Sequence, residues 1–100
     1  MKMLKSLDAR ITVLYQPNCP HCEELMKLLS DAQVESVTYK LFDKSPDCIR
    51  MIITSGARKT PIVEIITGDS LESLTIEYLN PDYVSVKDMY EKILQYFEEI

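Results

Sequence analysis

The chain has 100 residues, of which 46% are hydrophobic, and this predicts a single domain over residues 1–100 with a modest core. Its formal net charge is -5 and its basic residues are scattered among acids, so we expect neither nucleic acid nor an anionic membrane as a partner. The first ten residues lack the apolar core of a signal peptide, and no apolar run reaches membrane-spanning length, which predicts a cytoplasmic protein.

A pair of cysteines follows the first predicted strand. Residues 11–15 are apolar and β-forming, and the turn-like sequence at residues 16–18 ends them. Cys19-Pro20-His21-Cys22 comes next and opens a predicted helix, with Pro20 in its first turn. Thiols at a strand-to-helix junction are placed for dithiol–disulfide chemistry, because the N–H groups and dipole of a helix start favour a thiolate on Cys19. The alternatives are half of a zinc site or two unrelated cysteines.

The next segments continue the alternation of strand and helix. Residues 37–42 are rich in β-forming side chains and predict a second strand. Ser-Pro-Asp at residues 45–47 is a helix-start signal, and Gly56 offers a stop, so a second helix is predicted between them. Cys48 falls in the first turn of this helix, where we expect a small buried hydrophobe in preference to an activated thiol.

The second half of the chain predicts a hairpin followed by a helix. Residues 61–66 and 74–79 are two strands, and residues 67–73 turn the chain between them. Ser-Val-Lys-Asp at residues 85–88 is a capping box for a last helix whose apolar face extends to Phe97. The order βαβα-ββα predicts an α/β protein with a four-stranded mixed sheet flanked by helices, which is the minimal thioredoxin fold.

With these elements the chain resembles a small glutaredoxin or glutaredoxin-like thioredoxin, from about Ile11 to the last helix. Three features carry the resemblance: the Cys-Pro-His-Cys motif, Thr60-Pro61 before the third strand, and the hairpin with its closing helix. The resemblance implies a thioredoxin-like, glutaredoxin-type domain with a cis bond before Pro61 that faces the dithiol. It also implies a thiol-disulfide oxidoreductase that reduces or exchanges protein disulfides. Cys19 is then the nucleophile, and Cys22 releases the reduced substrate.

Several positions depart from the family patterns. Pro20-His21 is the middle pair of a bacterial disulfide oxidase, and a histidine there can lower the pKa of the Cys19 thiol and make the disulfide more oxidising. The alternative for His21 is a solvated helix residue without effect. Gln16 stands where glutathione-binding glutaredoxins commonly carry a basic residue, and residues 80–83 lack the glycines of their glutathione-binding turn. The external reductant is therefore open between glutathione and a thioredoxin reductase system.

Four residues around the dithiol are predicted to contact substrate: Gln16, Lys59, Thr60 and Pro61. The Thr60 backbone is expected to pair with a substrate chain in β fashion. Lys59 and its neighbour Arg58 can hold a carboxylate or can be solvated surface. We expect a monomer without a bound cofactor or metal, whose partners are protein disulfides and a reductant or reductase.

Two other functions stay open at this level. One is a non-catalytic adaptor of thioredoxin fold, in which the cysteine pair is incidental. The other is a metal- or iron–sulfur-binding glutaredoxin-like protein that uses Cys19, Cys22, His21 or Cys48. A structural zinc site needs four ligands, usually with a second pair of Cys or His, and the sequence has no such pair.

Overall fold

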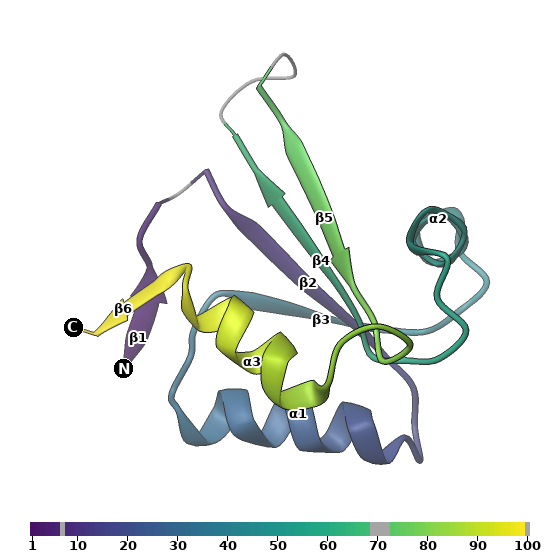
Figure 1. Cartoon of the computed structure of the whole chain (residues 1–100), viewed down its shortest axis with the longest axis horizontal. Helices are drawn as coiled ribbons and strands as arrows, with labels where there is room; N and C mark the ends of the chain where they lie inside the picture. The colour runs from purple at the N-terminus through teal and green to yellow at the C-terminus, as the bar shows by residue number, and fades with distance from the viewer. Residues whose placement is uncertain (7, 69–72, 100) are drawn as a thin grey trace.

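A four-stranded mixed sheet with helices on both faces forms the body of the molecule (Figure 1). The computed structural model describes residues 1–6, 8–68 and 73–99, and these ranges contain three helices and six strands. None of the helices in these ranges is long and apolar enough to span a membrane. The main sheet and its helices are β2 (Arg10–Tyr15), α1 (Pro20–Asp31), β3 (Val37–Leu41), α2 (Pro46–Ser55), β4 (Ile62–Thr67), β5 (Thr75–Leu79) and α3 (Val86–Leu94).

The strands of this sheet lie in the order β3-β2-β4-β5. β2 pairs in parallel with β3 and antiparallel with β4, and β4 pairs antiparallel with β5. The predicted α/β class and the mixed four-stranded sheet are therefore confirmed. The hairpin of β4 and β5 is also confirmed, whereas its predicted turn falls partly on residues 69–72, which lie outside the described ranges.

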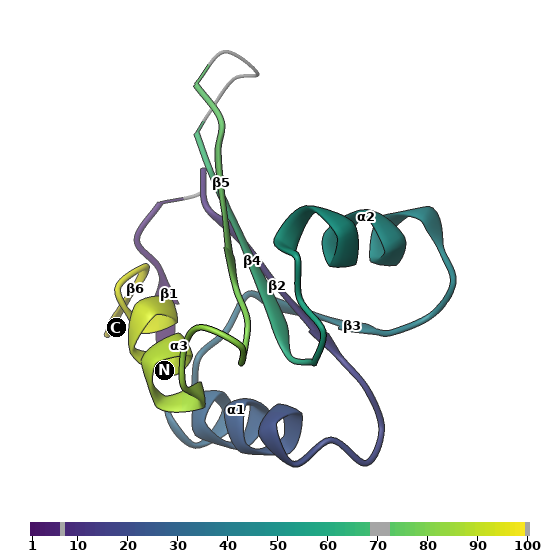
Figure 2. The ribbon, with the colours of Figure 1, turned by 45° about the vertical axis from the view of Figure 1, so that its right-hand side comes forward.

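Both faces of the central strands β2 and β4 are covered. Figure 2 shows α1 and α3 on one side of the sheet and α2 on the other. Because side chains alternate along a strand, the neighbours Val13 and Leu14 enter different cores. The larger core, beside α1 and α3, contains Ile11, Val13, Leu25, Leu29, Val63, Ile65, Val86, Met89, Ile93 and Phe97. The smaller core, beside α2, contains Leu14, Cys48, Met51, Ala57 and Ile62.

Each helix begins after a residue whose side chain caps it. Cys19, Ser45 and Ser85 accept hydrogen bonds from the backbone N–H three residues further on, at 3.2, 3.4 and 3.1 Å respectively. Proline takes the first position of α1 and of α2, where its missing N–H leaves no helical bond unmade. Gly56 ends α2 in the left-handed region, with φ at 68°. The predicted helix starts at Ser45 and Ser85 and the stop at Gly56 are confirmed.

The last helix is shorter than the sequence predicted. α3 ends at Leu94, and Phe97 instead opens a strand, β6 (Phe97–Glu99), which pairs antiparallel with β1 (Lys2–Leu4). Phe97 lies opposite Leu4 and is 5% exposed, so it reaches the larger core from the strand. The prediction that Phe97 is buried is therefore confirmed, whereas the prediction that it lies in the last helix is wrong. Pairing with β1 gives the backbone of residues 97–99 the hydrogen-bond partners that a further helical turn would have given.

A carboxylate is buried on the central strand β4. Glu64 faces α2, and its side chain is 6% exposed. Arg50 Nη1 donates to Glu64 Oε2 at 3.0 Å and to the Tyr78 hydroxyl at 3.0 Å, and that hydroxyl donates to the same Glu64 oxygen at 2.8 Å. A tyrosine hydroxyl is protonated at neutral pH, and desolvation and the bond to Glu64 raise the pKa of Tyr78 further. This triangle joins α2, β4 and β5 and offsets the desolvation of the carboxylate.

We expect Tyr78→Phe to lower the free energy of unfolding by about 1.5 kcal/mol, the low end for a hydrogen bond to a charged group, because Arg50 still pairs with Glu64. Urea denaturation of the oxidised protein measures the change. Tyr83→Phe is the matched control, since Tyr83 is 83% exposed and its replacement should change stability by less than about 0.5 kcal/mol. Equal losses in the two variants would contradict a stabilising role for the triangle.

Candidate active site

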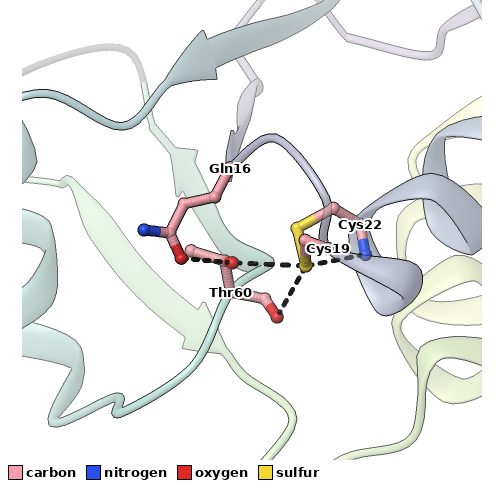
Figure 3. The surroundings of a disulfide bond; sticks show 4 residues. All are labelled: Gln16, Cys19, Cys22 and Thr60. Carbon is pink, nitrogen blue, oxygen red and sulfur yellow. Dashed lines mark hydrogen bonds between the residues drawn. A yellow bond between two sulfur atoms is a disulfide. The ribbon is translucent and has the colours of Figure 1, made fainter.

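A disulfide between Cys19 and Cys22 stands where β2 leads into α1 (Figure 3). The two Cα atoms are 5.2 Å apart. Cys22 is completely buried, at 0% exposure, whereas Cys19 is half-buried. Only the Cys19 sulfur can therefore meet a second protein, which is the asymmetry that an attacking and a resolving thiol require.

The Cys19 sulfur occupies the capping position of α1. It accepts a hydrogen bond from the Cys22 N–H at 3.2 Å, and the Cys19 carbonyl accepts one from the Glu23 N–H at 3.0 Å. The side chain thus takes the place that an oxygen of Ser or Asp fills in other helices. A negative charge on this sulfur would be stabilised by the same N–H and by the positive end of the helix dipole.

Thr60 meets the Cys19 sulfur from the other side, 41 residues along the chain. The sulfur lies 3.5 Å from the Thr60 carbonyl oxygen and 3.3 Å from the Thr60 hydroxyl oxygen. The peptide bond between Thr60 and Pro61 is cis, as the resemblance implied. Thr60 is 8% exposed and Pro61 is buried, so this wall of the site is packed against the fold.

Gln16 completes a short polar chain that ends at the sulfur. The Thr60 hydroxyl donates to Gln16 Oε1 at 3.1 Å (Figure 3). A disulfide sulfur has no proton, so the hydroxyl is the only possible donor between Thr60 Oγ1 and Cys19 in the oxidised state. Once Cys19 becomes a thiolate, the same hydroxyl can turn to the sulfur and stabilise its charge. Gln16 therefore positions the Thr60 hydroxyl.

A cavity of about 450 Å³ opens beside the disulfide, lined by residues 16–21 and 58–60. The structure thus brings together nearly all of the predicted site residues, from two segments that are distant in the sequence. Pro61 and Cys22 do not line this cavity, because both are buried behind it. Among the described residues, no group of three His, Cys, Asp or Glu side chains is arranged to hold a metal ion.

His21 is exposed in the first turn of α1 and lines the cavity. No hydrogen bond joins His21 to Cys19 within the described part of the chain. An effect of His21 on the Cys19 thiol through charge stays a prediction. The spare thiol of Cys48 is fully buried in the core beside α2, with its sulfur 3.9 Å from the Leu41 carbonyl oxygen, which agrees with its interpretation as a small hydrophobe.

Arg58 and Lys59 are exposed at the rim of the cavity. Asp82 accepts a hydrogen bond from the Arg58 backbone N–H at 3.1 Å, which fixes this segment. Within residues 1–6, 8–68 and 73–99, neither basic side chain forms an ion pair. Both cations are therefore available to a negatively charged group that enters the cavity.

A second hollow, of about 210 Å³, was not anticipated from the sequence. It shares Gln16, Arg58, Lys59 and Thr60 with the first cavity, and its apolar part consists of Phe42, Ile52, Ala57 and Ile62. Phe42 follows β3 directly, Ile52 lies in α2, Ala57 lies in the segment after α2, and Ile62 begins β4. No motif marks them in the sequence, because their neighbourhood exists only once the sheet has formed.

Comparisons with protein-family models and with curated proteins find no match for this chain.

We expect Thr60→Val to raise the pKa of the Cys19 thiol by about one pH unit, because the variant keeps the shape of the side chain and removes the hydroxyl that can donate to the thiolate. The rate at which iodoacetamide alkylates the reduced protein, followed against pH, gives this pKa. In the unaltered protein it should lie below the ordinary thiol value of about 8.5. Thr54→Val, at an exposed position of α2, is the matched control. An unchanged pKa in Thr60→Val would exclude the proposed hydrogen bond.

Proposed function

We propose that this protein is a thiol-disulfide oxidoreductase of thioredoxin-like fold that reduces or exchanges protein disulfides. One observation carries the proposal. A half-buried sulfur caps a helix, its disulfide partner is fully buried, and Thr60, which precedes a cis proline, meets the sulfur from the other side. A pair that served only to stabilise the fold would gain nothing from an accessible sulfur at the positive end of a helix.

The proposed reaction begins with both cysteines reduced and Cys19 ionised. The Cys19 thiolate attacks one sulfur of the substrate disulfide, so a Cys19–substrate bond forms and the substrate S–S bond breaks. The departing substrate sulfur carries the electron pair and takes a proton. Cys22 gives up its proton and attacks the Cys19 sulfur, which forms the disulfide seen in the structure and releases the second substrate thiol. Two electrons pass from protein to substrate.

An external reductant reverses this oxidation, and we assign that role to glutathione or to a thioredoxin reductase system. The protein is proposed to act as a monomer in the cytoplasm, where a labile dithiol is kept reduced. An extended substrate chain is expected to pair with the backbone of Thr60, which lines the cavity and whose carbonyl oxygen lies 3.5 Å from the Cys19 sulfur.

Trapping of the mixed disulfide between protein and substrate distinguishes the proposed roles of Cys19 and Cys22. With dithiothreitol as the electron source, the unaltered protein should accelerate the reduction of insulin. Cys22→Ser, reduced beforehand and freed of dithiothreitol, should instead accumulate a covalent complex with insulin, because Cys19 can attack and nothing resolves the product. Added dithiothreitol should release this complex. Cys19→Ser should do neither, and Cys48→Ser is the control for loss of a thiol outside the site. If the unaltered protein reduces neither insulin nor any small disulfide, the function as a non-catalytic adaptor is favoured. If anaerobically purified protein contains metal, the metal-binding function is favoured.

The charge of His21 is tested by the reduction potential of the Cys19–Cys22 pair against glutathione. If His21 stabilises the Cys19 thiolate, the potential should be higher than the value of about -270 mV for thioredoxin. It should then fall in His21→Ala, because the reduced form loses that stabilisation. A potential near that of thioredoxin in both proteins would remove the proposed oxidising role of the Pro20-His21 pair.

A further inference from the structure

The two hollows beside Cys19 adjoin along a common wall. The first contains the disulfide, and the second extends from it toward α2. The residues common to both are Gln16, Arg58, Lys59 and Thr60. The two adjoining hollows are together called the Cys19–Phe42 groove, after one residue that lines each of them. A peptide that presents a sulfur to Cys19 and extends toward α2 would pass the common wall.

The far end of this groove is apolar. Phe42 is 36% exposed, and its backbone N–H is held by the Tyr15 carbonyl at 2.8 Å, which continues the pairing between β3 and β2. Ile52 of α2 is half-buried, and Ala57 and Ile62 form a buried floor. A small aliphatic side chain placed there would leave water for apolar surroundings on several sides.

The common wall carries positive charge on a protein whose formal net charge is -5. Arg58 and Lys59 are both exposed there, and neither side chain forms an ion pair among the described residues. The nearby Asp82 carboxylate is engaged by the Arg58 backbone N–H. Because the protein as a whole is anionic, these two exposed cations favour a carboxylate at one place along the groove.

We propose that the Cys19–Phe42 groove selects protein disulfides in which the attacked cysteine is next to an acidic residue and an aliphatic residue lies beyond it. The acid would pair with Arg58 and Lys59, and the aliphatic side chain would enter the hollow at Phe42. This selectivity rests on the proposed function, because the groove matters only if Cys19 attacks a substrate. The order of sites along the groove sets the order cysteine, acid, aliphatic residue in the substrate.

Symmetric peptide disulfides test the proposal. The probe is the homodimer of Leu-Glu-Cys-Glu-Leu, which presents the same neighbours in either chain direction and at either sulfur. The comparison peptides replace Glu by Lys or Leu by Ser. Pre-reduced protein is mixed with each peptide, and the peptide thiols are quantified by chromatography. Each rate is divided by the rate with dithiothreitol alone, because neighbouring charges alter the reactivity of a disulfide without any groove.

On this scale the Glu-Leu peptide should react about tenfold faster than the Lys peptide and several-fold faster than the Ser peptide. Lys59→Glu should remove or invert the preference for Glu, and Phe42→Ala should remove the preference for Leu. Lys27→Glu and Ile53→Ala are the matched controls, since both residues are exposed and line neither hollow, and they should keep the preferences.

A small neutral disulfide, hydroxyethyl disulfide, separates a failure of the proposed selectivity from a failure of the proposed oxidoreductase function. If the protein reduces it and the three peptides react at equal normalised rates, the selectivity is wrong and the proposed function stands. If the protein reduces neither this compound nor any peptide, the function and the selectivity that rests on it both fail. Preferences that persist in Lys59→Glu and Phe42→Ala would also overturn the role of the groove.

Discussion

The antiparallel pairing of β2 with β4 is the constraint on which the site depends. In this register Leu14 lies opposite Ile62, so the end of one central strand and the start of the other share an edge of the sheet. The segments beyond that edge carry the cysteine pair and Thr60, and they meet although 41 residues separate them. Burial of both strands on two faces holds the register firmly, because a slip by one residue would exchange the two cores.

The two faces of the sheet hold different helices in different ways. The larger core holds α1, and with it the capping sulfur, against α3. The smaller core holds α2 with only a few apolar side chains, and the triangle of Arg50, Glu64 and Tyr78 supplements it. Since Ile52 of α2 lines the second hollow, the polar network that anchors α2 also helps to hold this hollow in shape.

The sequence predicted the parts of the fold that leave local signals. Local signals predicted the helix caps, the helix stop and the cysteine pair, because each depends on neighbours within a few residues. The caps are Ser45 and Ser85, and the stop is Gly56. The pairing of β1 with β6 was not predicted, since strands of three residues carry little pattern and their partners lie at opposite ends of the chain. The apolar end of the groove was missed for the same reason: strand ends, a helix and a loop meet there only in three dimensions.

The Thr60 hydroxyl has a single proton, and two acceptors lie within its reach, Gln16 Oε1 and the Cys19 sulfur. When the disulfide is closed, the proton satisfies the Gln16 oxygen. When Cys19 is a thiolate, the sulfur competes for that proton and leaves the Gln16 oxygen open on the wall of both hollows. In the proposed reaction, the reduced protein would then offer a chain in the groove a Gln16 oxygen freed of its internal hydrogen bond, and the oxidised protein would not.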